Sequence, residues 1–136
     1  MNAVDTNVLI YAWDPRDPVK QQTANDLLDA ITDGILLWQV AIEFLAASRK
    51  LVPFGFNLTA AFDEIRDTLT VWKLVTPNEN ILDSVEDLIA RFSLAFWDAL
   101  VIAGSLEAGA DRLYSEDFTG YPNIDGMDII NPFATP

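Results

Sequence analysis

The sequence has 136 residues, and 51% of them are hydrophobic, which suits one domain with a substantial buried core. It contains neither cysteine nor histidine, which excludes disulfides, thiolate nucleophiles, cysteine-based zinc sites and imidazole bases. Asp and Glu number 21 against 8 Lys and Arg, for a net charge of −13. This charge argues against nucleic-acid binding by general electrostatic attraction, and it favours carboxylate chemistry with a hard cation such as Mg²⁺ or Mn²⁺.

The apolar runs are shorter than the roughly 18–20 residues of a membrane span, and the start of the chain does not resemble a signal peptide. We therefore expect a cytoplasmic protein without a membrane contact. The hydrophobic pattern of the first half alternates short strands with longer helices. In chain order it predicts strand Ala3–Thr6, helix Asn7–Trp13, helix Lys20–Asp33, strand Ile35–Trp38 and a helix Gln39–Val52 that is closed by Pro53.

The second half continues the alternation. It predicts a helix from Leu58 to Trp72, strand Lys73–Val75, a helix that the capping box Thr76–Glu79 opens and that runs to Phe92, helix Phe96–Ala108, and strands Asp111–Ser115 and Met127–Ile130. Alternation of this kind is typical of an α/β fold. We therefore expect a single domain over residues 1–136, with three α/β/α layers and a mainly parallel central sheet.

Three acids lie where such a fold binds ligands. Ligands of open α/β sheets bind beyond the carboxyl ends of the strands. Asp5 ends the first predicted strand, and Asp117 follows the fourth. Asp98 lies in the first turn of its helix, where the helix dipole tolerates a negative charge. Taken alone, Asp98 is better explained as an ordinary acid at a helix start than as a ligand.

Glu43 is less ordinary because the other seven residues of 40–47 are apolar. A glutamate in such a segment needs a partner, which is either a metal ion or a cation such as Arg49 at the edge of the helix. If all four acids converge, each like-charged pair at 4 Å costs roughly 4 kcal/mol at an effective dielectric of about 20. A bound Mg²⁺ or Mn²⁺ would relieve this repulsion and activate water for phosphodiester hydrolysis.

Four motifs then make the chain recognisable. Asp5–Ala12, Ile42–Phe44, Phe96–Ala103 and Leu113–Asp117 followed by Ile130–Phe133 resemble, in order, the motifs of the PIN-domain ribonucleases, and most closely those of the VapC toxins. The resemblance implies a PIN-like fold, RNA cleavage, a bound Mg²⁺ or Mn²⁺, a homodimer and a VapB-type antitoxin as partner. It also implies that Asp5, Glu43, Asp98 and Asp117 are the catalytic and metal-binding acids.

The resemblance extends to supporting residues. Thr6, Asn7 and Ser115 are expected to orient the carboxylates and water. Arg16, Lys20, Arg49 and Lys50 lie in segments that border the expected crevice, and they are candidate substrate contacts. One departure is Ala95, which stands where these toxins often have a serine that could cap the helix of Asp98.

Two other classes of function remain open. A catalytically idle PIN domain would serve as an RNA- or protein-binding module, although all four acidic positions are filled here. A phosphatase of the Asp-x-Asp type or a phospho-receiver is less well supported. Thr6 and Asn7 follow Asp5 where the phosphatase needs a second Asp, and no lysine follows Lys73 where the receiver needs one.

Overall fold

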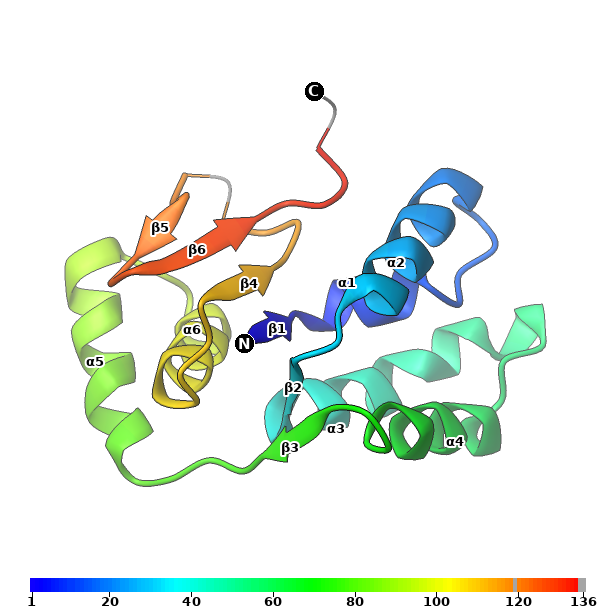
Figure 1. Ribbon diagram of the computed structural model, residues 1–136, viewed down its shortest axis with the longest axis horizontal. Coiled ribbons are helices and arrows are strands. Elements are labelled where there is room, and N and C mark those ends of the chain that lie inside the picture. The colour runs from blue at the N-terminus through cyan, green and yellow to red at the C-terminus, as the bar shows by residue number, and fades with distance from the viewer. Residues whose placement is uncertain (119, 135–136) are drawn as a thin grey trace.

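The computed structural model describes residues 1–118 and 120–134 (Figure 1). Within these residues one sheet has the order β3–β2–β1–β4–β6–β5, and only β5 runs antiparallel to its neighbour. Its strands are β1 (Asn2–Val4), β2 (Gly34–Leu37), β3 (Lys73–Val75), β4 (Arg112–Tyr114), β5 (Asn123–Ile124) and β6 (Met127–Ile130). All four residues of β2 are buried, as in a parallel strand that is covered on both faces.

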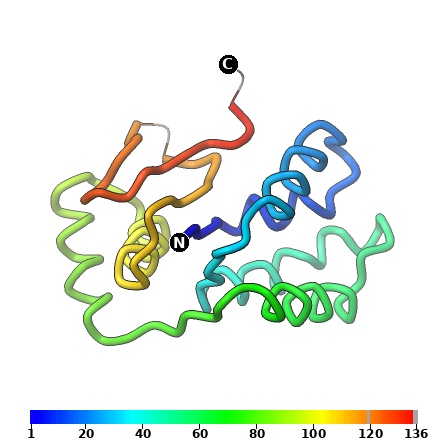
Figure 2. Tube along the Cα trace, in the orientation of Figure 1, coloured from blue at the N-terminus to red at the C-terminus, as the bar shows by residue number. Residues whose placement is uncertain are grey.

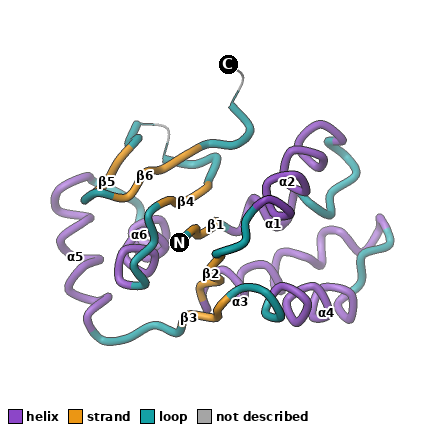
Figure 3. Tube along the Cα trace, in the orientation of Figure 1, coloured by secondary structure: helices purple, strands orange, loops and turns teal. Residues whose placement is uncertain are grey.

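The helices form the two outer layers (Figures 1 and 3). They are α1 (Thr6–Tyr11), α2 (Pro18–Ala30), α3 (Trp38–Ala47), the 3₁₀ helix η1 (Ser48–Phe54), α4 (Leu58–Thr68), α5 (Asn80–Phe92) and α6 (Phe96–Glu107). The Cα trace shows α1–α4 gathered on one side of the sheet and α5 and α6 on the other (Figure 2). The expected three-layer α/β/α fold with a mainly parallel sheet is confirmed. No helix in the described part of the chain is long and apolar enough to cross a membrane.

The order of the strands reverses next to β1. From β1 the chain moves outward through β2 to β3, and it then returns to place β4 on the opposite side of β1. Val4 pairs with Tyr114, and the backbone N–H of Asp5 donates to the carbonyl of Tyr114 at 2.9 Å, so both strands end at the same edge. Such a reversal opens a crevice at the carboxyl ends of the two strands.

Several predicted boundaries are wrong. β1 ends at Val4, and Thr6 already belongs to α1 because the Asp5 side chain caps that helix. α2 begins at Pro18, since Asp17 accepts a hydrogen bond from the Lys20 N–H and caps it. The predicted helix Gln39–Val52 stops as an α-helix at Ala47 and continues as η1 to Phe54, which contains Pro53. Proline provides no backbone N–H for the α-helical pattern.

Two further differences lie in the second half. The predicted capping box at 76–79 does not form. α5 begins at Asn80, whose N–H donates to the Asn78 side chain, and Glu79 makes no capping hydrogen bond. Strand β5 was not predicted. It is joined to β6 by Asp125 and Gly126, whose φ angles of 51° and 90° suit a tight hairpin turn.

Candidate active site

Asp5 follows β1 directly, at the edge of the sheet where the paired strands β1 and β4 end. It is only 6% exposed and caps α1, where one carboxylate oxygen accepts the Thr6 N–H at 2.7 Å. The other oxygen accepts the Ser115 hydroxyl at 2.8 Å. Since Thr6 is the next residue and Ser115 follows β4, both neighbouring strands fix the orientation of this carboxylate.

Glu43 lies in the middle of α3, and its hydrogen-bond partners in the described residues are polar and uncharged. The Thr6 hydroxyl donates to Oε2 at 2.8 Å, and the Gln39 amide donates to Oε1 at 2.6 Å. In the described residues Arg49 forms no ion pair with Glu43, so the alternative of an edge acid neutralised by Arg49 is not what the structure shows. Two neutral donors orient Glu43 without neutralising its charge.

Asp117 lies on the loop that follows β4. The Asn7 amide donates to its Oδ2 at 3.3 Å and also to the Ser115 hydroxyl oxygen at 3.4 Å. The backbone N–H of Asp117 donates to the same serine oxygen at 3.0 Å. Asn7 and Ser115 therefore connect Asp117 to Asp5, in the positions that the sequence motifs assigned to orienting residues.

Asp98 is half-buried in the first turn of α6. The preceding Ala95 makes no side-chain cap, as its residue type predicts. Burial raises the pKa of Asp98, and the charges of Asp117 and Glu43 raise it further. Asp98 thus belongs electrostatically to the group of acids, although α6 reaches the site from the opposite helical layer (Figure 1).

The four acids repel one another, and Asp5 shows this most clearly. Burial raises the pKa of Asp5 from 3.8 to about 6, against the hydrogen bonds of Ser115 and Thr6, which favour the charged form. The charges of Asp117 and Glu43 raise this pKa further. Asp5 and Asp98 each interact with both Asp117 and Glu43, and the crevice therefore concentrates uncompensated negative charge.

The donor chemistry of the crevice fits a hard divalent cation. Its oxygen donors are four carboxylates and the hydroxyls of Thr6 and Ser115, which Mg²⁺ and Mn²⁺ prefer. Within residues 1–118 and 120–134, however, no three acidic side chains surround a common point as metal ligands do. Asp117 is exposed and Asp98 is half-buried.

Two of the four candidate substrate contacts are occupied by acids. Arg16 pairs with Asp14 through two hydrogen bonds of 2.9 and 2.8 Å. Lys20 donates to Glu116 at 2.9 Å and to the Tyr11 hydroxyl at 3.2 Å. Arg49 and Lys50 are exposed on η1. The structure therefore leaves Arg49 and Lys50 as the better candidates for contacting an anionic substrate.

Sequence reasoning missed the role of two residues. Gln39 orients Glu43 and also reaches the backbone carbonyl of Trp97 at 3.4 Å, which connects α3 with the helix of Asp98. The four-residue spacing of Gln39 and Glu43 on one helix is the signal that could have revealed this contact. Glu116 accepts from Tyr11 at 2.6 Å as well as from Lys20, and it anchors the loop of Asp117 on α1 and α2.

The fold and the acidic crevice define an α/β protein with its site at the reversal of strand order. The PIN domain family model matches residues 3–122, and the chain therefore belongs to the PIN domain family. A comparison with curated proteins finds no significant match.

Solved structures with the same fold include several toxin–antitoxin proteins. A toxin–antitoxin complex from Klebsiella pneumoniae aligns with a TM-score of 0.74 at 17% identity, over 99% of this chain and 100% of that one. VapC20 of Mycobacterium tuberculosis, a toxin that cleaves the sarcin–ricin loop, aligns with a TM-score of 0.68 at 18% identity, over 88% and 94% of the two chains. VapBC2 of Rickettsia felis, bound to promoter DNA, aligns with a TM-score of 0.67 at 12% identity, over 96% and 97%.

Proposed function

We propose that this protein is a metal-dependent endoribonuclease of the PIN domain family and the toxin of a toxin–antitoxin pair. The observation that carries the proposal is the buried Asp5, held at the reversal of strand order and in electrostatic contact with Asp117 and Glu43. Burying a carboxylate beside other carboxylates costs stability unless a cation compensates them. Such a site suits chemistry on a phosphodiester, with Mg²⁺ or Mn²⁺ as cofactor.

Each acid has a distinct place in this proposal. Asp5, with both oxygens already oriented by Thr6 and Ser115, is the fixed ligand. Asp98 and Asp117 complete the metal site from the opposite helical layer and from the loop after β4. Glu43, oriented by Thr6 and Gln39, would hold the attacking water and accept its proton, or would bind the metal, at the edge that faces the substrate. A bound ion would supply positive charge to the phosphodiester and lower the pKa of water.

The partners follow from the same site. The related solved structures include complexes of a toxin with its antitoxin, and we propose a VapB-type antitoxin for this chain as well. An antitoxin arginine would pair with the acidic crevice, because its planar guanidinium binds carboxylates through two hydrogen bonds. We further propose a homodimer that acts on cytoplasmic RNA.

A catalytically idle PIN domain remains the second candidate. It would retain the fold without needing the acids as a group. The hydrogen bonds that orient Asp5, Glu43 and Asp117 argue for the nuclease, because a binding module would gain nothing from holding uncompensated acids together.

The test compares two aspartates that each lie in the first turn of a helix. Asp98 lies in the first turn of α6, and Asp83 lies in the first turn of α5. Asp98→Asn is expected to abolish Mg²⁺- or Mn²⁺-dependent cleavage of single-stranded RNA without loss of the folded circular-dichroism spectrum. Asp83→Asn is expected to cleave like the wild type. A folded Asp98→Asn protein with full activity would refute the assignment.

A further inference from the structure

Asp117 lies on an exposed loop whose position has to be held by its surroundings. The next residue, Phe118, has a φ angle of 64°, in the left-handed region that a residue with a side chain rarely adopts. Such a conformation persists only where neighbouring contacts impose it. The contacts of this loop therefore decide where Asp117 lies relative to Asp5.

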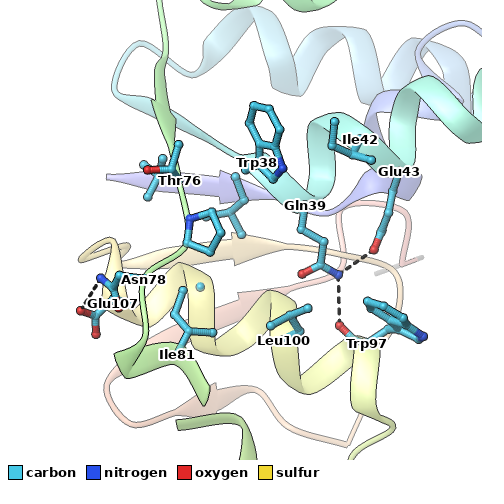
Figure 4. Close-up of a pocket in the computed structure, with 14 residues that line it drawn as sticks. Trp38, Gln39, Ile42, Glu43, Thr76, Asn78, Ile81, Trp97, Leu100 and Glu107 are labelled. Atoms are coloured by element: carbon cyan, nitrogen blue, oxygen red, sulfur yellow. Dashed lines mark hydrogen bonds between the residues drawn. The ribbon is translucent and has the colours of Figure 1, made fainter. Parts of the chain in front are cut away.

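Glu43 shows how another acid of the site is held directly. It lies at the edge of an apolar groove whose walls include Trp38, Ile81 and Leu100. Figure 4 shows the Gln39 amide donating to the Glu43 carboxylate at 2.6 Å and reaching the backbone carbonyl of Trp97 at 3.4 Å. The Asn7 amide donates to the Asp117 carboxylate at 3.3 Å, longer than the roughly 2.9–3.0 Å of a typical N–H···O bond. The position of Asp117 thus depends more on the backbone that carries it.

Glu116, the residue before Asp117, is held by a closed set of hydrogen bonds. The Tyr11 hydroxyl donates to one oxygen of its carboxylate at 2.6 Å, and the Lys20 ammonium donates to the other at 2.9 Å. Lys20 also donates to the Tyr11 hydroxyl oxygen at 3.2 Å, which closes the set. The ammonium lies over the rings of Tyr11 and Phe133, 4.6 and 5.6 Å from their centroids. The Lys20 and Glu116 side chains are 33% and 25% exposed, so their ion pair is partly shielded from water.

Helix α1 joins this ion pair to the acids. The helix begins at its cap, Asp5, and ends at Tyr11. Asn7 and Tyr11 are four residues apart and therefore share one face of the helix. The first donates to Asp117 and the second to Glu116. A loop that moved away from this face would carry Asp117 away from Asp5.

We infer that Lys20 is a positioning residue: its ion pair with Glu116 holds the loop after β4 so that Asp117 and Asp5 reach the same metal ion. This inference rests on the proposed ribonuclease function and explains how one of its ligands is placed. Lys20 itself touches neither the metal nor the RNA. Its loss should therefore lower metal affinity and kcat, whereas the loss of a phosphate contact would raise KM for RNA.

The charge of Lys20 makes the sign of the effect informative. Lys20 is a permanent cation, because its hydrogen bonds to Glu116 and Tyr11 raise its pKa to about 12. If only its charge acted on the site, removing it would tighten the binding of a metal cation. Removing a residue that orients ligands weakens metal binding, typically by 10- to 100-fold. Since Lys20 acts through Glu116, we expect the lower end of this range, about tenfold.

Mn²⁺ titration by calorimetry measures this effect. In Lys20→Met, methionine keeps an unbranched apolar side chain against the two rings but provides neither the charge nor the N–H donors. This variant should bind Mn²⁺ about tenfold more weakly than the wild type. Lys20→Arg keeps the charge and the donors, and it should recover most of the affinity. Unchanged or tighter Mn²⁺ binding by Lys20→Met would overturn the inference.

Arg91→Met is the matched control. Arg91 pairs with Asp125, 34 residues away, through hydrogen bonds of 2.9 and 2.6 Å, and it lies over the ring of Phe92. This ion pair joins α5 to the turn between β5 and β6, and none of the four acids belongs to these elements. Arg91→Met should lower the free energy of unfolding and leave Mn²⁺ affinity and RNA cleavage unchanged.

Hydrogen exchange in EDTA tests the loop without a metal. The backbone N–H of Asp117 donates to the Ser115 hydroxyl oxygen at 3.0 Å, so its exchange rate reports whether the loop is held. This N–H should exchange at least several-fold faster in Lys20→Met than in the wild type, and at the wild-type rate in Arg91→Met. Equal rates in Lys20→Met and the wild type would overturn the inference.

A double-mutant cycle tests whether the two residues act as a pair. Glu116→Gln removes the acidic partner, and the double variant Lys20→Met/Glu116→Gln completes the cycle. If the ion pair positions the loop, the double variant should lose less Mn²⁺ affinity than the product of the two single losses. Losses that simply multiply would show that Lys20 and Glu116 act independently, which contradicts the inference.

The cleavage assay separates this inference from the function on which it rests. A lower kcat at unchanged KM in Lys20→Met supports both. An unchanged kcat with a raised KM would make Lys20 a substrate contact, which overturns the positioning role and leaves the nuclease. A wild type that binds Mn²⁺, with the expected loss in Lys20→Met, but cleaves no RNA would keep the positioning role and remove the nuclease.

Discussion

The hydroxyl of Ser115 donates to the Asp5 carboxylate at 2.8 Å, and its oxygen accepts the backbone N–H of Asp117 at 3.0 Å. One fully buried serine thus connects the acid that follows β1 with the acid on the loop after β4. The contact exists because Val4 and Tyr114 are paired in register, which brings the ends of the two strands together.

Replacing this serine should weaken the metal site. Ser115→Ala removes a hydrogen bond that favours the charged form of Asp5, and the pKa of Asp5 should rise above its value of about 6. Loss of a residue that orients metal ligands typically costs 10- to 100-fold in metal affinity or activity. Mg²⁺ titration by calorimetry measures the loss. Ser105→Ala is the matched control, because Ser105 is equally buried but its hydroxyl donates to the Val101 carbonyl within α6.

Glu43→Gln tests whether Glu43 acts at the site through its charge. Glutamine keeps the size of the side chain but loses one acceptor and the negative charge, so metal affinity and RNA cleavage should both fall. The free energy of unfolding should change little, since Glu43 makes no ion pair in the described residues. Glu64→Gln is the control: burial raises the pKa of Glu64, which lies on α4, and this change should leave activity intact. Unchanged metal affinity in Glu43→Gln would reduce Glu43 to a structural residue.

The metal-free protein should lose stability as the pH rises from about 4 to about 6. The pKa of Asp5 is raised from 3.8 to about 6, so in this window the folded state binds more protons than the unfolded state. The full difference corresponds to about 3 kcal/mol. Denaturation of the wild type and of Asp5→Asn in EDTA measures the free energy of unfolding of each protein across this range. The advantage of Asp5→Asn over the wild type should grow as the pH rises. Acids with a lowered pKa, such as Asp14 and Asp125, change the stability at lower pH. Both proteins contain them, so their contributions cancel when the wild type is compared with Asp5→Asn.

Added Mg²⁺ should reverse this dependence in the wild type alone. A cation that binds the folded state and favours ionised carboxylates stabilises the protein more as the pH rises. Asp5→Asn should show little stabilisation by Mg²⁺ at any pH. The pKa assigned to Asp5 would be contradicted if, without metal, the free energies of unfolding of the wild type and of Asp5→Asn differed by a constant amount from pH 4 to 7.

Much of the fold was predictable because local patterns and tertiary structure agree. Short apolar runs became the parallel strands, and Asp5 was correctly placed at the end of the first. The errors occurred where side chains decide a boundary. Asn78 rather than Thr76 supplies the hydrogen bond at the start of α5. The two-residue strand β5 is too short for a hydrophobic pattern, although Asp125-Gly126 is a strong hairpin signal.

The site was less predictable than the fold. The four acids could be named from their motifs, and the structure shows that Asp5 and Asp98 each interact electrostatically with both Asp117 and Glu43. Ion pairs between residues far apart in the chain could not be read from the sequence. Lys20 was expected to face the substrate, but it pairs with Glu116, 96 residues away along the chain. The apolar groove beside Glu43 was equally hidden, because Trp38, Ile81 and Leu100 come from three separate helices.

RNA binding should depend steeply on divalent metal and only weakly on monovalent salt. Each phosphate neutralised by a basic side chain adds about −0.7 to the slope of log K against log salt for a single strand. If Arg49 and Lys50 alone contact phosphates, the slope should be about −1.4. Anisotropy measurements in increasing KCl, at fixed Mg²⁺ and then in EDTA, give both dependences. The double variant Arg49→Ala/Lys50→Ala should flatten the slope, and Lys73→Ala, exposed at the outer strand β3, should not. Tight binding in EDTA that falls sharply with KCl would show that a basic surface holds the RNA, and would favour the idle binding module over the nuclease.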